Sequence, residues 1–464
     1  MKTSHIRLSA ALALVPACVA AAPAVTAKTP PPSVEAMAPY ILESDRLAWD
    51  FVEGITTEVG PRQAGTEAEK RGREWAMRWL SRNGFTNVAD EPFEMDTWIP
   101  GDLARAHVVS PFPQPLVLQP LGDSAATPPG GLTAEVLEYA DIDALRAAGP
   151  ELKGRIAYIS HAMTRTQDGS QYGFAGPARW VGAGIAASKG AVATVIKSVG
   201  TDWHRNPHTG GTDFPEGVAP TPAAALSLPD AANLERMFDR AGGAPIVLKL
   251  ELNPQNLGRT ISGNVVGEIV GRDPSLPPVL VACHIDSWWN GTGAFDDAAG
   301  CGIVAAAATY SAKNGQRPLR TIRVLMAGAE ETGLWGSKAY SAAHINEPIA
   351  VALESDFGAD RVWQFQSNFR DSNPALHARI AKAVAPLGVS NSSAVATGGA
   401  DINIARDQKT AIIDLQQDGT RYFDLHHTPD DTLDKIDPVQ LRQNVAVWAV
   451  VISILANEPG AIKP

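Results

Sequence analysis

The chain has 464 residues, 45% of them hydrophobic, which is enough to bury a large core in more than one domain. With only three cysteines in this length, a small disulfide scaffold is excluded. A formal net charge of -11 and the absence of lysine- and arginine-rich runs argue against nucleic acid or an anionic membrane as partner. A small molecule or a peptide is expected instead.

The first 27 residues predict a secretory signal peptide. Lys2 and Arg7 precede an apolar run, and small residues follow up to a cleavage position after Ala27. The run falls short of the roughly 20 residues that a membrane span needs, and two prolines interrupt it. Lipidation of Cys18 is the competing interpretation. We expect a secreted or periplasmic protein, and no later segment is predicted to span a membrane.

The next two segments differ in character. Residues 34 to 112 predict helices around the loop EVGPRQAGT, then a helix stop and a strand at NGFTNV. Residues 113 to 254 hold short β-like runs, AEVLEY and GRIAYIS, a small helix at GAGIAAS and proline-rich loops. The third glycine of a dinucleotide-binding motif is absent from GAGIAAS, so this stretch predicts only a helix packed on a sheet.

From residue 255 to 464 strands and helices alternate, which predicts an α/β fold. Cys283 and Cys301 lie in apolar and alanine-rich runs, so we expect buried free thiols there. The predicted strands are apolar runs that end in polar residues: NVVGEIVG, PPVLVACHID, RTIRVLMAGAEE, EPIAVALESD and TAIIDLQ. Open α/β sheets bind their ligands beyond the carboxyl ends of the strands, which are here rich in His, Asp and Glu.

The polar residues at these ends predict a metal site. Each pair alone has a structural explanation, such as a helix cap or a solvated face. Together, carboxylates at the ends of buried strands need a cation or a hydrogen-bond network to offset desolvation. Imidazole and carboxylate ligands without thiolate suit zinc, with manganese or cobalt as substitutes. Two histidines and three acids exceed the needs of one catalytic zinc but suit two zinc ions that share a carboxylate.

The motifs HIDSW and GAFDDAAG, AGAEETGLWGS, LESD and HHTPDDT resemble, in this order, the five metal-site motifs of peptidase family M28. HIDSW is most similar to the carboxypeptidase Q branch of that family. The resemblance covers nearly the whole mature chain. It implies a phosphorylase/hydrolase-like mixed sheet flanked by helices, of the zinc exopeptidase type, formed by residues 34 to 112 and 255 to 464. Residues 113 to 254 are implied to be an inserted, mainly-β domain of the protease-associated type.

The resemblance also implies the ligands of two zinc ions. Asp296 would bridge both ions, His284 and Asp356 would hold one, and Glu331 and His427 would hold the other.

Residues around the ligands are implied to orient them. Asp286 would accept the free N–H of His284, and Asp431 would accept that of His427. Asp297 would hold the geometry of the loop.

Glu330 matches the general base of the family, which takes a proton from the water between the metals and returns it to the leaving amine. His426 stands where many members carry tyrosine, and it is expected either to donate to the developing oxyanion or only to pack. Trp288 and Trp289 either line the substrate cleft or pack, and Asp401 is assigned to the wall of the substrate pocket.

The sequence therefore predicts an exported di-zinc exopeptidase that cleaves dipeptides or short peptides with a free amino terminus. Aminopeptidase, dipeptidase and carboxypeptidase preference and side-chain specificity are left open, and a homodimer is implied by the resemblance alone. The two alternatives are a receptor-like binding protein that has lost its metals and a glutaminyl cyclase with one zinc. Both are disfavoured because all five ligands and Glu330 are present.

Overall fold

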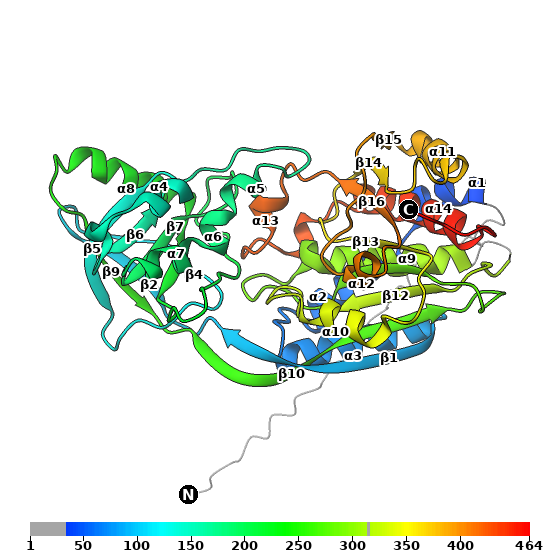
Figure 1. Ribbon diagram of the computed structural model, residues 1–464, viewed down its shortest axis with the longest axis horizontal. Coiled ribbons are helices and arrows are strands. Elements are labelled where there is room, and N and C mark those ends of the chain that lie inside the picture. Colours follow the sequence, from blue (N-terminus) through cyan, green and yellow to red (C-terminus); the bar gives the residue numbers. More distant parts are fainter. Residues whose placement is uncertain (1–33, 313–315) are drawn as a thin grey trace, which may run out of the picture.

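The computed structural model describes residues 34–312 and 316–464, so the predicted signal peptide and Cys18 lie outside the described residues. Figure 1 shows two bodies side by side, each built on one eight-stranded sheet. The larger body contains both ends of the described chain, and the smaller body is formed by a continuous central segment.

The sheet of the larger body is mixed. Its strand order is β1-β10-β12-β11-β13-β16-β14-β15. The central strands β12, β11, β13 and β16 are parallel, whereas β1 pairs with β10, and β14 with β16, in antiparallel fashion. The bounds are β1 (Thr86–Ile99), β10 (Gln255–Ile269), β11 (Val279–His284), β12 (Ile322–Ala327), β13 (Val351–Glu354), β14 (Val362–Ser367), β15 (Ser390–Asn391) and β16 (Ala411–Gln417). The predicted mixed α/β sheet is confirmed.

Helices cover both faces of this sheet, which explains why the central strands are apolar throughout. Along β11, Val281 and Cys283 face one core, whereas Leu280 and Ala282 face another. The first core is closed by α1 (Val34–Ser44), α2 (Leu47–Glu58), α3 (Glu67–Arg82), α9 (Ala299–Ala312), α11 (Pro374–Val384) and α14 (Pro438–Ala456). The second core is closed by α10 (Trp335–His344) and α12 (Asn403–Asp407).

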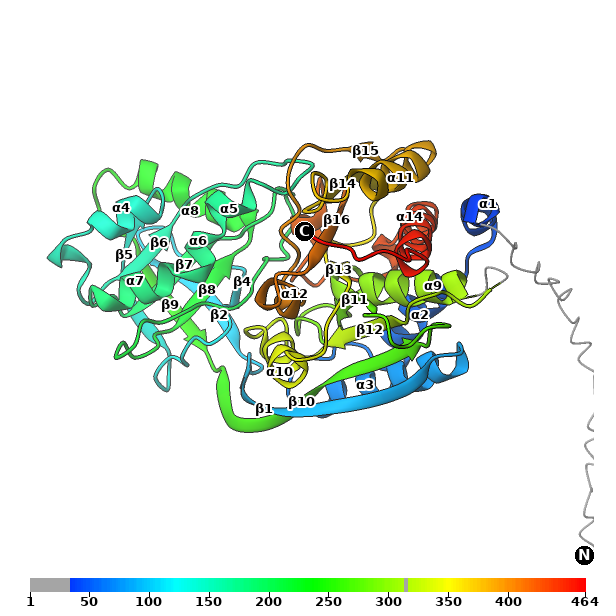
Figure 2. The ribbon, with the colours of Figure 1, turned by 45° about the vertical axis from the view of Figure 1, so that its right-hand side comes forward.

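Helix α9 lies between the sheet and α14 (Figures 1 and 2). Its residues from Ala299 to Ser311 are buried, and most of them are small, which lets neighbouring elements approach closely. A Cβ atom on Gly300 would lie 2.0 Å from the carbonyl oxygen of Ser355 and 2.2 Å from Oδ1 of Asp297. Glycine is therefore required where this helix meets the predicted metal site.

Helix α14 corrects one expectation. An 18-residue window of this 19-residue helix has a mean hydropathy of 1.5, so by length and composition it could cross a membrane, although no later segment was predicted to do so. However, 78% of this stretch is buried inside the molecule, where it packs on α1, α9 and α11. This burial is typical of a core helix.

The second sheet has the order β3-β2-β9-β5-β6-β7-β8-β4. Its strands are β2 (Ala104–Ser110), β3 (Gln114–Leu116), β4 (Leu118–Pro120), β5 (Leu132–Tyr139), β6 (Ile156–Ile159), β7 (Ala193–Lys197), β8 (Ala223–Leu226) and β9 (Val247–Leu252). Helices α4 (Ile142–Ala147), α6 (Pro177–Trp180) and α7 (Gly182–Ser188) cover one face, and α8 (Leu228–Arg240) covers the other. The prediction of mainly β structure is wrong here, because helices protect both faces of the parallel strands β5 to β8.

Two adjacent strand pairs connect the bodies. The chain leaves the larger body at the end of β1 and returns at the start of β10, and β1 pairs with β10 just as β2 pairs with β9 (Figure 1). Further contacts lie where α5 (Tyr172–Ala175) meets α13 (Tyr422–Leu425): the rings of Tyr172 and Phe423 stack with centroids 4.2 Å apart. The smaller body therefore closes over the loop that carries HHTPDDT.

Cys283 and Cys301 form a disulfide, so the prediction of free thiols is wrong. The bond joins the end of β11 to the first turns of α9. Both residues are buried on the face where this strand and helix pack together, a contact that their sequence separation of 18 does not reveal.

Candidate metal centre

The five predicted ligands lie together beyond the carboxyl ends of the parallel strands. His284 ends β11, Glu331 follows β12 and Asp356 follows β13. Asp296 comes from the short irregular helix η2 (Ala294–Ala298) before α9, and its peptide bond to Asp297 is cis. His427 comes from the loop after α13. The arrangement follows from the parallel sheet, because strand ends of one direction share one edge.

Asp296 lies at the centre of the cluster. Its Oδ1 is 3.1 Å from Nε2 of His284, and its Oδ2 is 3.3 Å from Nε2 of His427. The two oxygens of one buried carboxylate thus face two different imidazoles. This is the geometry that a carboxylate shared by two metal ions requires.

The remaining two acids each accompany one histidine. Oδ1 of Asp356 is 3.4 Å from Nε2 of His284, and Glu331 contacts Nε2 of His427 through Oε2. The pairs are those that the resemblance implies.

Several carboxylate oxygens of the cluster have no hydrogen-bond partner in the described chain, although they are buried. They are Asp296 Oδ2, Glu331 Oε1 and Asp356 Oδ1. Buried anionic oxygens without partners are costly, and divalent cations remove this cost. Imidazole nitrogens and carboxylate oxygens without thiolate are a donor set that fits zinc.

The pKa values of three acids at the site are raised because these side chains are buried close to other acids. Burial, against the opposing charge of His284, raises the pKa of Asp356 to about 6, and burial likewise raises the pKa of Glu331. Burial holds the pKa of Glu330 well above its ordinary value, and Asp356 and Glu331 add to this effect. Without a cation, burial therefore shifts these side chains towards their protonated forms.

Asp286 is fully buried and supports the segment that carries two of the acids. Its carboxylate accepts the backbone N–H groups of Glu330 at 3.1 Å and Glu331 at 3.3 Å. Nδ1 of His284 lies 3.2 Å from the backbone carbonyl of Asp286 and 3.6 Å from its carboxylate. The predicted contact with His284 is therefore made chiefly through the main chain of Asp286.

The predicted partner of His427 is different from the observed one. Its Nδ1 lies 3.2 Å from the backbone carbonyl oxygen of Thr209, in the smaller body. Asp431 instead accepts the backbone N–H groups of Phe295 at 2.5 Å and Asp296 at 3.2 Å. Asp431 thus fixes the loop of the central carboxylate.

Asp297 holds the loop as expected. Its carboxylate accepts the backbone N–H of His284 at 3.2 Å and that of Gly300 at 3.1 Å. It thereby ties the end of β11 to the start of α9.

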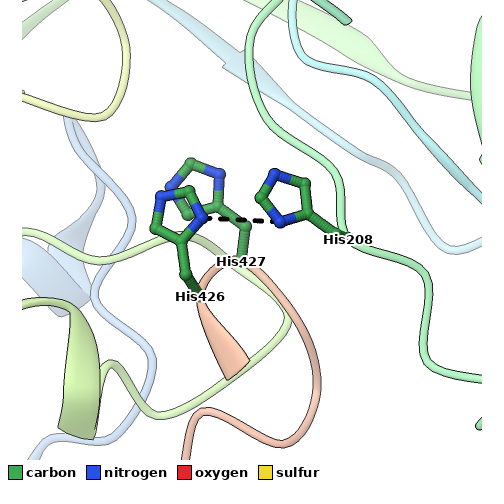
Figure 3. Close-up of side chains that lie close together, drawn as sticks. All are labelled: His208, His426 and His427. Atoms are coloured by element: carbon green, nitrogen blue, oxygen red, sulfur yellow. Dashed lines mark hydrogen bonds between the residues drawn. The ribbon is translucent and has the colours of Figure 1, made fainter. Parts of the chain in front are cut away.

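His426 stacks on His427 with ring centroids 3.7 Å apart, and its Nε2 lies 3.4 Å from Oδ2 of Asp296. Its other ring nitrogen, Nδ1, lies 3.4 Å from Nδ1 of His208. Figure 3 shows His208 reaching across from the smaller body to this stacked pair. No role for His208 is predicted from its surroundings in the chain, because 218 residues separate it from His426 and no motif surrounds it.

Arg62 is a second residue that sequence reasoning missed, since EVGPRQAGT was interpreted only as a loop. Its side chain is fully buried and donates to three backbone carbonyls, those of Ile285 at 2.6 Å, Thr292 at 2.7 Å and Gly293 at 2.9 Å. Arg62 therefore clamps the loop between His284 and Asp296.

Trp288 packs in the interior rather than lining an open cleft. It is 3% exposed, its ring stacks on His427 with centroids 4.9 Å apart, and its Nε1 donates to Oγ1 of Thr209 at 2.6 Å. Trp289 is half-buried.

A cavity of about 200 Å³ adjoins the cluster at Asp356. Its acidic lining also includes Asp168 of the smaller body, Glu354 and Asp414. Burial, with Asp356 nearby, raises the pKa of Glu354 to about 8, so this carboxyl keeps its proton near neutral pH unless a cation enters. Asp401, assigned to a pocket wall, is buried beside Glu354, whose Oε2 accepts its backbone N–H at 2.6 Å.

Comparisons with known proteins agree with the fold and the cluster. A family model described as Peptidase family M28 matches residues 264–452. Carboxypeptidase Q of Bos taurus is 32% identical over 405 residues, 87% of this chain and 84% of that protein. Carboxypeptidase Q of Homo sapiens is 31% identical over 406 residues, with the same coverage.

Two solved structures extend the comparison. A crystal structure of a Peptidase M28 precursor from Shewanella amazonensis SB2B has a TM-score of 0.89 at 42% identity, covering 93% of this chain and 97% of that chain. The zinc aminopeptidase BSAP from Bacillus subtilis has a TM-score of 0.63, covering 92% of this chain and 95% of its own. At 19% identity, this second likeness is one of fold alone.

Fold, cluster and relatives together define a metal-dependent exopeptidase of the α/β class. The chain belongs to peptidase family M28. The resemblance recognised in its motifs, including that to carboxypeptidase Q, is confirmed.

Proposed function

We propose that this M28 exopeptidase holds two zinc ions and hydrolyses dipeptides or short peptides with a free amino terminus. The observation that carries the proposal is the central position of Asp296, whose two oxygens face His284 and His427 separately. Each of these histidines has its own acid, Asp356 or Glu331. Two equivalent half-sites around one shared carboxylate support two ions rather than one.

In this proposal His284 and Asp356 would hold the first ion, Glu331 and His427 would hold the second, and Asp296 would be a ligand of both. When bound, the two ions supply Lewis-acid activation of a water molecule and of the scissile carbonyl group. Manganese and cobalt suit the same ligands and are proposed as substitutes.

Glu330 is the proposed general base. It lies next to Glu331, its backbone N–H donates to Asp286, and its carboxyl group is close enough to His284 and Asp356 for their charges to act on its pKa. With its pKa raised, it is suited to take a proton from the attacking water and to give it to the leaving amine. His426, with Nε2 directed at the cluster, is the proposed donor to the developing oxyanion.

The acidic cavity beside Asp356 is the proposed seat of the free amino group of the substrate. Its volume of about 200 Å³ suits a small group, and its acidic lining favours an ammonium ion over a carboxylate. An acetylated amino terminus would lose that charge.

Three further proposals concern the rest of the chain. We propose that it is exported to the periplasm or outside the cell, which the Cys283–Cys301 disulfide supports because such bonds persist in oxidising compartments. The smaller body is proposed to be an inserted protease-associated-type domain, supported by the return of the chain to the strand paired with β1. It contains residues 113 to 254 as predicted but also β2, which pairs with β9, so it begins earlier than the predicted boundary. A homodimer is proposed from the family resemblance alone.

The test combines zinc analysis with hydrolysis of a dipeptide panel and its N-acetylated counterparts. We expect about two zinc ions per chain and cleavage of the free dipeptides only. Glu330→Gln should keep both ions and lose about 100-fold or more in kcat, as expected for loss of a general base. Glu74→Gln, on an exposed position of α3, is the matched control and should behave as wild type.

Each other outcome has a definite meaning. Two zinc ions without cleavage of any peptide would leave the site standing and reject the substrate class. One ion per chain would reject the shared role of Asp296. Equal cleavage of acetylated peptides would reject the acidic cavity as the amino-terminal site.

A further inference from the structure

We propose that Arg179 and His208 of the smaller body set the tautomer of His426, so that its Nε2 carries the hydrogen and points it at the cluster. Three side chains form a hydrogen-bond chain with only one allowed direction. This inference rests on the proposed function, because it explains how His426 becomes a donor to the oxyanion. Arg179 and His208 are positioning residues in it.

The direction is set at Arg179, because a guanidinium group carries donors only. Its Nη1 lies 3.2 Å from the carbonyl oxygen of Thr209 and 3.3 Å from Nε2 of His208. Nδ1 of His427 is also near, at 3.4 Å, but that nitrogen already faces the Thr209 carbonyl and carries a hydrogen itself. The two hydrogens of Nη1 therefore go to Thr209 and His208. Nε2 of His208 must be an acceptor.

The next step follows from the chemistry of imidazole. A neutral ring with an acceptor at Nε2 carries its hydrogen at Nδ1. Nδ1 of His208 lies 3.4 Å from Nδ1 of His426, so His208 donates and His426 accepts (Figure 3). His426 then carries its own hydrogen at Nε2, the nitrogen that lies 3.4 Å from Oδ2 of Asp296.

The smaller body holds both positioning residues in place. The guanidinium of Arg179 lies over the rings of Tyr172 and Trp180, 5.6 Å and 5.9 Å from their centroids. Gly210 makes room for it, since a Cβ atom there would lie 2.2 Å from Nη1. The backbone N–H of His208 donates to Oγ of Ser198 at 2.7 Å.

The three histidines could also be interpreted as a third metal site, because one nitrogen of each lies within 4.8 Å of the others. The position of Arg179 opposes this interpretation. Its Nη1 lies within 3.4 Å of both His208 and His427, where it would repel a metal cation. The hydrogen bonds from Arg179 to His208 and from His208 to His426 explain the positions of these rings without an ion.

The first test reads the tautomers directly in zinc-loaded wild-type protein labelled with ¹⁵N-histidine. NMR correlations between ring nitrogens and ring carbon-bound protons distinguish hydrogen at Nδ1 from hydrogen at Nε2, and His208→Asn and His426→Gln variants assign the signals. We expect hydrogen at Nδ1 in His208 and at Nε2 in His426. Hydrogen at Nδ1 of His426 would overturn the inference, and so would three zinc ions per chain.

The second test compares two replacements of similar size. His208→Asn keeps an N–H donor near the position of Nδ1, whereas His208→Leu removes it. The Leu variant should lose about 100-fold in kcat with KM changed less than about twofold, as for loss of an oxyanion donor, and the Asn variant should recover most of that loss. His107→Leu, on β2 of the same body, is the control and should match wild type.

The two tests separate this inference from the proposed function. If wild-type protein cleaves no peptide, the proposed function fails while the tautomer measurement still decides the direction of the chain. Equal losses in the Asn and Leu variants, or a loss in KM alone, would overturn the inference even in an active enzyme. The tautomers are read in the wild-type protein, and the variants serve there only to assign its signals.

Discussion

Asp356 and Glu331 are acids that the fold places among other acids, and their protonation should therefore compete with zinc. Burial raises the pKa of Asp356 to about 6 and raises that of Glu331 in the metal-free protein. Below about pH 6 the side chain of Asp356 holds a proton that zinc must displace, and the raised pKa of Glu331 acts in the same direction. We expect zinc affinity to be weaker at pH 5 than at pH 7.5, with protons released on binding. Isothermal titration in buffers of different ionisation enthalpy measures both quantities.

The raised pKa of Asp356 also makes the stability of the metal-free protein depend on pH. A carboxyl group whose folded-state pKa lies above its ordinary value of 3.8 stabilises the fold while it is protonated, and this contribution is lost as pH rises towards about 6. Chelated protein should therefore lose part of its thermal stability between pH 4 and 6, whereas zinc-loaded protein should not. A zinc affinity that is constant from pH 5 to 7.5 would contradict this account.

Replacing Arg62 should lower the free energy of unfolding strongly, although this residue belongs to none of the metal-site motifs. Arg62→Met leaves three buried carbonyls without their donor, and we expect a loss of about 3 to 5 kcal/mol in the free energy of unfolding. Urea denaturation measures this loss. Arg78→Met, at an exposed position of α3, should change the value by less than about 0.5 kcal/mol. Similar effects of the two replacements would show that the Arg62 clamp is unimportant.

At the scale of elements, the disulfide joins β11 and α9 directly beside the metal centre. Its loop of 18 residues restricts the unfolded chain, so replacing Cys283 and Cys301 together by alanine should cost about 3 kcal/mol in unfolding free energy. Urea denaturation of the double variant measures the cost. Peptide mapping after thiol labelling of denatured, unreduced wild-type protein should find both residues unreactive. Two reactive thiols would contradict the bond.

The elements of the larger body were largely predictable because their signals are local. The strands β11, β12 and β13 fall within stretches identified from hydrophobic pattern, and β16 matches its stretch except for its last residue. For β10 only the C-terminal part was identified, because its first residues, Gln255 to Gly263, are mostly polar or glycine. The candidate ligands follow from the same pattern, since they stand where apolar runs end. Strand β14 was not predicted, because WQFQ mixes polar and aromatic residues without a clear apolar run.

Contacts between distant segments were not predictable from pattern. His208, Arg179 and Thr209 reach the site only because the smaller body folds back onto the HHTPDDT loop. The pairing of Cys283 with Cys301 and the burial of Arg62 likewise depend on which elements pack together. Asp431 was placed correctly beside the site but given the wrong partner, since sequence cannot show that Thr209 approaches His427 more closely.

At the scale of the whole molecule, Asp424 joins the two bodies. Its carboxylate accepts from Nη2 of Arg165 and from the backbone N–H of Thr201, both at 2.5 Å, and it is 6% exposed. Asp424→Ala should weaken the contact by about 1 to 3 kcal/mol, because buried hydrogen bonds to a charge are lost. Hydrogen exchange should then quicken in residues 199–209 and 421–428. Asp239→Ala, exposed on α8, should leave exchange there unchanged, and equal exchange in both variants would contradict a role for Asp424.

The hydrogen bond from His427 to Thr209 spans the two bodies, since the imidazole belongs to one and the carbonyl to the other. Zinc binding at His427 and the contact between the two bodies would therefore be linked by a coupling free energy. Each would strengthen the other by the same factor. If His427 holds a zinc ion as proposed, a change that separates the bodies should weaken zinc binding there, and removal of zinc should loosen the bodies by the same factor. A metal bound there would thus stabilise the contact between the two bodies as well as take part in catalysis.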